Sequence, residues 1–201
     1  MKNLKLLLPA LLLAAACSSA GIPFEQRPLA CVMPFIYAAS DAQYSSSVTG
    51  LQDSLTASLM KTGRIRLLER ARVDAAMAEL KLSAAGVVDS NTAAQVGKQI
   101  GARYAVLGSV TAVSVKDEWR SVKIAEKTDR IVEVGVEARL VNLETGELLG
   151  AGRATGKAKS SEKHAFGGKI GTLAKPEAII QKAIMSITDD LAEDLVKNIG
   201  K

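Results

Sequence analysis

The side chains in this sequence that are best suited to chemistry are few and lie far apart. His164 is the single histidine and stands in the polar stretch SSEKHAFGG, where a histidine is more often solvated than catalytic or metal-bound. Glu69 and Glu79 could form a carboxylate pair, but a structural ion pair with Arg70 or Arg72 is the preferred interpretation. One histidine and two cysteines do not supply a metal-ligand cluster. We therefore expect no enzyme, no metal and no other cofactor.

The glycines between residues 97 and 108 do not form a phosphate-binding loop, because their spacing matches neither GxGxxG nor GxxxxGK[ST]. We expect them to end a helix and to allow close packing of helix on sheet. The formal net charge is +5, and it falls to +3 if Lys2 and Lys5 leave with a signal peptide. That bias is too weak to indicate a nucleic-acid partner.

The N-terminus has the pattern of a secretory signal. Two lysines precede an apolar run from Leu6 to Leu13, and a stretch of small residues then leads to Cys17. The small residues resemble a lipobox, with Ala14 where leucine is usual, so Cys17 is the expected lipidation site. The alternative is an ordinary signal peptide with an incidental cysteine. Ser18 resembles the residue that sorts lipoproteins to the outer membrane.

We expect the chain to have three parts, which are a signal peptide (1–16), a lipidated N-terminus with a tether (17–29) and one folded domain (30–201). With 48% hydrophobic residues, the domain can bury a real core. Acylation of Cys17 would leave Cys31 unpaired in an exported protein. Cys31 stands in the apolar stretch ACVMPFIY, which indicates a buried small hydrophobe rather than a redox group.

Apolar residues recur at spacings of three and four in four segments, which predicts helices over Val48–Met60, Arg70–Leu82, Thr92–Ile100 and Pro176–Asn198. The second of these helices carries four inward-facing residues, Val73, Ala76, Met77 and Leu80. Gly86 and Asp89 mark the turn to the third helix. The last helix has a continuous apolar stripe from Ile180 to Leu195.

Five segments are expected to be strands: Ala30–Tyr37, Arg64–Glu69, Tyr104–Val115, Ile131–Leu143 and Leu148–Ala154. The fourth alternates cleanly between apolar and polar residues, and the sequence NLETGE then forms a hairpin turn. Lys116–Asp129 is interpreted as a charged connection and Thr155–Lys175 as a polar, glycine-rich segment. The predicted fold is a single α/β domain with a mixed sheet and helices packed on it.

Four stretches resemble the CsgG family of curli production assembly/transport lipoproteins, together with HfaB-type relatives. They read LLER, VDAAMAELKLSAAG, AAQVGKQIGARYAVLGSVT and VEARLVNLETGELLGAG. The resemblance implies a CsgG-like periplasmic domain and a ring-shaped homo-oligomer. It also implies a location at the periplasmic face of the outer membrane, a lipid anchor, and a secreted or periplasmic protein as partner.

In that family each subunit gives two β-hairpins to a shared outer-membrane barrel, and the matching segments here are Lys116–Asp129 and Thr155–Lys175. A membrane strand needs about 9–11 residues with outward apolar alternation. Eight of the fourteen residues in the first segment are charged. The second offers only Phe166, Ile170 and Leu173 as large apolar side chains. We therefore expect a family member without its own transmembrane barrel.

The family also has a loop after the first strand that lines a constriction with an amide and an aromatic side chain. Gln43 and Tyr44 fall at the matching positions, whereas Ala39 stands near the place of a further aromatic residue. The resemblance implies a constriction role for Gln43 and Tyr44. The alternative is a polar loop that simply precedes a helix.

The sequence is compatible with two functions from different classes. The first is a periplasmic ring or adaptor in the export or assembly of extracellular fibres. The second is an LpoB-type lipoprotein that activates a peptidoglycan-synthesising penicillin-binding protein. About twelve residues separate Cys17 from the first expected strand, and an extended chain spans at most ~3.6 Å per residue. This short tether favours a role close to the outer membrane.

Overall fold

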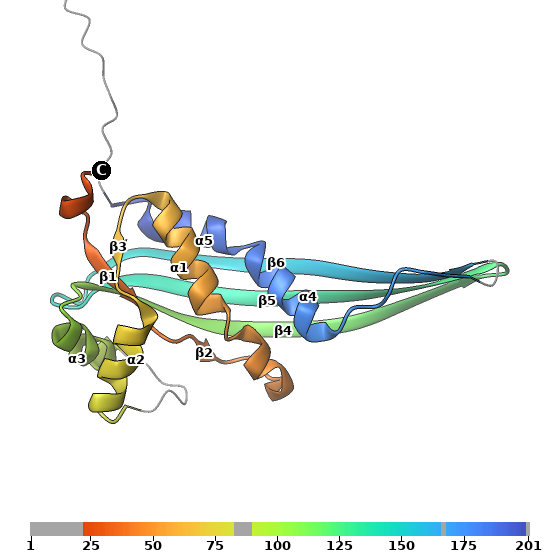
Figure 1. The fold of residues 1–201 in the computed structure, drawn as a ribbon, viewed down its shortest axis with the longest axis horizontal. Helices are drawn as coiled ribbons and strands as arrows, with labels where there is room; N and C mark the ends of the chain where they lie inside the picture. The colour runs from red at the N-terminus through yellow and green to blue at the C-terminus, as the bar shows by residue number, and fades with distance from the viewer. Residues whose placement is uncertain (1–21, 83–89, 166–167, 200–201) are drawn as a thin grey trace, which may run out of the picture.

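Seven strands form one mixed sheet in the computed structural model, which describes residues 22–82, 90–165 and 168–199 (Figure 1). The strands are β1 (Leu29–Val32), β2 (Ile36–Tyr37), β3 (Arg66–Leu67), β4 (Tyr104–Val122), β5 (Ala125–Asn142), β6 (Leu148–Ala165) and β7 (Gly168–Ile170). Their order is β3-β1-β4-β5-β6-β7, and β2 pairs with β4. The β1–β3, β1–β4 and β2–β4 pairs are parallel, and the pairs from β4 to β7 are antiparallel. The predicted mixed sheet is therefore confirmed.

Helices cover both faces of this sheet. In the described residues they are η1 (Phe24–Gln26), η2 (Ala42–Val48), α1 (Leu51–Thr62), α2 (Arg70–Glu79), α3 (Ser90–Ile100), α4 (Pro176–Met185) and α5 (Thr188–Val196), where η denotes a 3-10 helix. The helices α1, α4 and α5 pack on one face of the central strands. The helices α2 and α3 pack on the other face, at the end where β1 and β3 lie (Figure 1).

The larger core lies between α1, α4, α5 and the sheet. Leu51, Leu55 and Leu59 recur every four residues in α1, and all three are fully buried there. The alternating residues of β5 that face this core are also buried, and they are Val132, Val134, Val136, Ala138 and Leu140. The predicted alternation in this strand is thus confirmed. The helix α1 ends at Gly63, whose φ is +65°.

A row of small residues in β6 lets the helices lie unusually close to the sheet. Register places Gly150, Gly152 and Gly156 opposite the core-facing residues of β5. A β-carbon added at Gly150 would overlap the backbone carbonyl of Leu195, and one added at Gly156 would overlap that of Ala183. The glycines of β6 therefore set the distance at which α4 and α5 dock.

A second, smaller core lies under α2 and α3. Val73, Met77 and Val96 are buried in it, as the helical spacing predicts. Leu80 was also expected on this inward face, but α2 ends at Glu79 and the Leu80 side chain stays 36% exposed beyond it. The predicted turn residues Gly86 and Asp89 lie outside the described residues.

Several predicted boundaries are corrected by the structure. The first strand is interrupted at Pro34 and continues as β2, because proline cannot donate to the ladder; both pieces pair with β4. The first long helix begins at Leu51, since the preceding residues form η2. The last helix is two helices that meet at Ser186, where the Ser186 hydroxyl donates to the Ala183 carbonyl at 2.7 Å. Its apolar stripe is nevertheless continuous and buried.

The largest correction concerns the segments predicted as connections. Lys116–Asp129 is not a charged loop, because β4 runs on to Val122 and β5 already begins at Ala125. Thr155–Lys175 is not a loop either, since β6 continues to Ala165 and β7 follows. Figure 1 shows these strands leaving the helices and running together to a narrow end. We call residues 116–131, 159–165 and 168–170 the arm, because Lys116, Ile131 and Lys159 pair side by side at its base.

Candidate functional site

Gln43 and Tyr44, the two residues of the expected constriction loop, lie in η2 but have different environments. The Gln43 side chain is exposed, and its amide nitrogen donates to the Asp41 carboxylate at 2.8 Å. Tyr44 is half-buried and packs against the larger core. Of the two, therefore, the surface-facing group is the Gln43 amide.

The loop that carries Gln43 is fixed at both ends. The Tyr37 hydroxyl donates to the carbonyl of Asp41 at 2.5 Å, and the Gln181 amide of α4 donates to the carbonyl of Ser47. Desolvation, with the nearby Asp41 as a further cause, raises the pKa of Tyr37 above its usual range. The phenol therefore stays protonated and can donate this hydrogen bond. These two hydrogen bonds fix the segment that carries Gln43, and they add no reactive group to it.

The arm is the second candidate surface, and cross-strand ion pairs stabilise its base. Arg130 donates two hydrogen bonds to Asp117 on the neighbouring strand, at 2.7 and 2.6 Å, and one to the Ala174 carbonyl at 3.0 Å. The Arg130 guanidinium holds the pKa of Asp117 below its usual range. Because this arginine also contacts the segment before α4, it ties the arm to the helical layer.

Further along the arm, Asp129 is buried between the strands with only 5% of its side chain exposed. Its carboxylate accepts hydrogen bonds from Lys127 at 2.6 Å and from Ser161 at 2.5 Å, and Lys159 lies 3.9 Å away. These contacts, Lys127 first, hold the pKa of Asp129 at about 2. A buried and fully paired carboxylate of this kind stabilises the sheet and is unsuited to proton transfer near neutral pH.

His164 lies in β6 rather than in a loop, which corrects the expectation from its polar surroundings. Its ring nitrogen is 2.9 Å from Glu162, and Glu162 also pairs with Lys169 of β7 at 2.8 Å. Hydrogen bonds hold the pKa of Glu162 at about 2. The strongest effect comes from Lys169, followed by His164 and the backbone amide of Leu173. Glu162 therefore joins β6 to β7 and to the segment that follows, and His164 is a neighbour of Glu162 on the same strand.

Two other predicted groups have structural positions. Cys31 is fully buried, and burial raises the pKa of its thiol to about 12, which agrees with the predicted small hydrophobe. The expected pairing of Glu69 and Glu79 with Arg70 or Arg72 is wrong, and Glu79 instead accepts a hydrogen bond from the Gln99 amide. Arg70 instead pairs with two aspartates. Asp53 of α1 is 3.0 Å away, and Asp74, one turn further along α2, is 3.4 Å away.

An open groove of about 540 Å³ lies on the sheet face that carries α2 and α3. Apolar residues such as Ile36, Leu107 and Leu148 line it together with the ion pair of Glu137 and Arg153. The carboxylate in the groove is thus neutralised by an arginine. The groove has the composition of a contact surface rather than of an acid–base site.

The remaining sequence-predicted site, Cys17, lies outside the described residues. The described chain begins at Ile22, whose carbonyl accepts a hydrogen bond from Arg27 at 3.0 Å. None of the helices in the described residues has the length and apolar character needed to cross a membrane. Within those residues, no group of three or more histidine, cysteine or acidic side chains is arranged to hold a metal ion.

The strands of the arm were missed because their residues are charged on both faces, so the apolar alternation of a half-buried strand is absent. The stretch Val115–Ala125 does contain three β-branched residues, Val115, Val122 and Ile124, among its polar side chains. That weak pattern is the one signal of a long hairpin in the sequence. Together with the clean alternation of β5 directly after it, the pattern could have indicated that the strands extend into the arm.

Comparison with known proteins relates nearly the whole described domain to one family. The family model described as "Curli production assembly/transport component CsgG" matches residues 28–200. A search of curated protein sequences found no match.

Among solved structures, the chain is similar to the lipoprotein GNA1162 from Neisseria meningitidis (14% identity, 81% of this chain and 99% of that chain, TM-score 0.47). It is also similar to the LpoB C-terminal domain from Escherichia coli (16% identity, 64% and 81%, TM-score 0.45). A third similar structure is the PelC dodecamer from Paraburkholderia phytofirmans (13% identity, 82% and 89%, TM-score 0.39). Similarity at this level does not carry a functional assignment.

Proposed function

The chain belongs to the family of the curli production assembly/transport component CsgG, and from this premise we propose a non-enzymatic outer-membrane lipoprotein. It acts in the export or assembly of extracellular fibres, as a periplasmic ring or adaptor built from several copies. The observation that carries the proposal is the family match over residues 28–200, which includes both cores, η2 and the arm.

The side-chain chemistry of the domain is consistent with a binding role. The buried carboxylate Asp129 and the groove carboxylate Glu137 are both neutralised by basic partners. The Cys31 thiol is inaccessible. Three features of the surface are accessible to a partner protein: the exposed Gln43 amide on η2, the groove, and the arm. We propose that the exported or bound protein contacts the surface around Gln43.

The proposed location follows from the N-terminus. Cys17 is the acylation site, and four residues separate it from Ile22, where the described fold begins. The five residue steps from Cys17 to Ile22 span at most ~18 Å in an extended chain. The domain is therefore held close to the periplasmic face of the outer membrane, whereas an activator of an enzyme in the inner membrane would need a longer reach.

Site-specific photo-crosslinking in living cells tests the proposal. A photoreactive amino acid replaces Gln43, and the captured protein is identified by mass spectrometry. We expect a secreted fibre subunit. The matched control replaces Gln95, an exposed glutamine on α3, on the opposite face of the sheet, and should not capture that protein. Capture of a peptidoglycan-synthesising penicillin-binding protein at position 43 would instead support an LpoB-type activator.

A further inference from the structure

The outer end of the arm breaks the usual rules for a hairpin turn. Lys123 and Ile124 form the two-residue loop between β4 and β5, where Asn-Gly or Asp-Gly is normally preferred. Val122 is 68% exposed and Ile124 64% exposed. Two large β-branched side chains in water at a turn do not stabilise the fold, so they point to a role in contact with something else.

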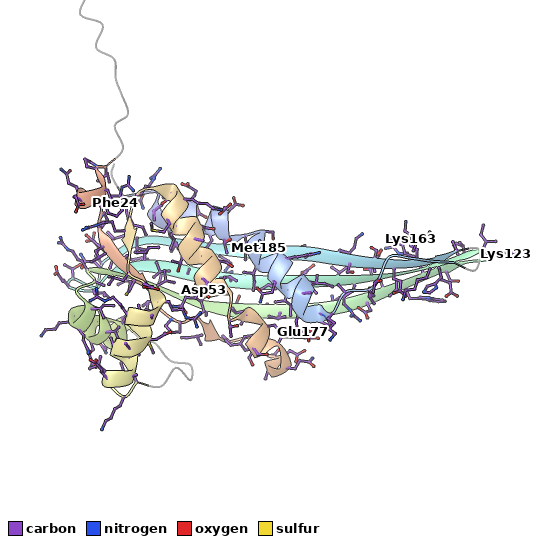
Figure 2. The ribbon with its side chains drawn as sticks, viewed as in Figure 1. Phe24, Asp53, Lys123, Lys163, Glu177 and Met185 are labelled. Atoms are coloured by element: carbon purple, nitrogen blue, oxygen red, sulfur yellow. The ribbon has the colours of Figure 1, made fainter. Side chains whose placement is uncertain are left out.

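Directly behind this turn lies a row of like charges. Arg120, Lys127 and Lys163 come from three neighbouring strands and pair side by side, so they project from the same face of the sheet. Like charges directly opposite one another destabilise a sheet. Arg120 and Lys127 have acidic neighbours on their own strands, whereas Lys163 has no ion-pair partner among the described residues. Figure 2 shows Lys123 at the end of the arm and Lys163 a short way behind it.

The net charge of the chain is concentrated in the arm. The arm contains eight lysine and arginine residues and five carboxylates, whereas the rest of residues 17–201 contains sixteen of each. The helical body is therefore balanced, and the arm carries the excess positive charge. An anionic partner would be attracted to this end of the molecule.

Exposed apolar side chains gather at the same end. Of the nine large hydrophobic residues that are exposed in the described chain, four lie at the end of the arm: Trp119, Val122, Ile124 and Ile170. Trp119 is the single tryptophan of the sequence and is 65% exposed. Val122 and Ile170 project from the same face of the sheet as the basic row, and Trp119 projects from the other face. Single exposed apolar residues are ordinary, but several at one end of a molecule mark a contact surface.

We propose that this end of the arm docks on the surface of a bilayer that contains anionic phospholipid. Tryptophan and aliphatic side chains partition into the headgroup region, and neighbouring lysines and arginines are attracted to anionic lipids.

This inference goes beyond the proposed function and does not depend on a ring or on a secreted partner. Figure 2 places Phe24, near the start of the described chain, at the opposite end of the molecule from Lys123. With acyl chains on Cys17 and the arm in the headgroup region, the protein has contacts at both ends.

The single tryptophan makes the test specific to the arm. The purified mature protein is mixed with vesicles of phosphatidylcholine alone or of phosphatidylcholine with phosphatidylglycerol, and Trp119 emission is recorded. We expect a shift to shorter wavelength, and quenching by lipids brominated near the headgroup, only with the anionic vesicles. The double variant Lys123→Gln, Lys163→Gln should weaken the response roughly tenfold or more.

A matched control removes two exposed lysines from the helical body, Lys81→Gln with Lys98→Gln, and should leave the emission response unchanged. Protein that binds the vesicles with unaltered Trp119 emission would overturn the proposal, because the acyl chains alone would then make the contact. A shift that depends on protein concentration without vesicles would also overturn it and would identify a second copy as the partner.

Discussion

Asp129 links two of the outer strands through a buried carboxylate. It is the one charged residue among the buried polar side chains of the described chain, and it joins Lys127 of its own strand to Ser161 of the next. A carboxylate that loses such partners is costly, because it stays buried without compensation. The sequence alone did not single out Asp129, since burial of a charge in an arm of this kind comes from pairing between strands.

The pH dependence of this contact has a defined sign. The pKa of Asp129 is depressed from its ordinary value of 3.8 to about 2 in the folded protein. Its contribution is therefore fully present above pH ~4 and is lost as the pH falls through about 2. Asp129→Asn should lower the melting temperature at pH 7, and its difference from wild type should shrink between pH 4 and pH 2.

Thermal denaturation followed by circular dichroism over this pH range measures the effect. Glu193→Gln serves as the control, because Glu193 is an exposed carboxylate of α5 with no ion pair in the described residues. That variant should follow wild type throughout. A melting-temperature difference for Asp129→Asn that stays constant from pH 7 to pH 2 would show that charge on Asp129 is not what stabilises the arm.

Other single residues show which positions could be predicted from the sequence and which could not. Cys31 was placed correctly, because an apolar strand on both sides leaves little alternative to burial. Leu80 was placed wrongly, since the helical spacing continues past the residue at which α2 ends. Gln43 and Tyr44 share a loop as expected, but only the structure separates the exposed amide from the half-buried ring. Their constriction role stays a prediction.

Secondary-structure elements were predictable wherever they bury one face. The stripes of α1, α3 and the α4–α5 pair, and the alternation of β5, follow from burial against one sheet. The arm was not predictable in this way, because its strands have charged residues on both faces and are stabilised by cross-strand pairs such as Asp117 with Arg130. The break at Ser186 was also hidden, since the apolar stripe continues through it.

The close docking of α4 on β6 yields a prediction about glycine. Gly156→Ala should reduce the free energy of unfolding by about 1–3 kcal/mol, because the added methyl group would overlap the Ala183 carbonyl and force the helix outward. Chemical denaturation measures the change. Gly168→Ala is the control, since the nearest atom to its added β-carbon lies at 3.6 Å. Equal stabilities for the two variants would contradict the close helix–sheet contact.

We propose that the attachment of the protein to the membrane rests on Cys17. Several acyl chains hold a protein firmly, whereas the contact that we infer for the arm is electrostatic and is screened at high ionic strength. Cys17→Ser should therefore release the folded protein into the soluble periplasmic fraction when cells are fractionated in detergent-free, high-salt buffer. Circular dichroism checks that the fold is intact. A folded variant that remains in the outer-membrane fraction and requires detergent would contradict a purely lipid anchor.

The central claim is that several copies of this CsgG-family domain act together as a periplasmic ring or adaptor. Native mass spectrometry of the chain from Ser18 onward, over a series of protein concentrations, tests it most directly. We predict a discrete species that contains several identical subunits, at least at the highest concentrations. A monomer at every accessible concentration would contradict the ring and would favour a lipoprotein that binds its partner as a single copy.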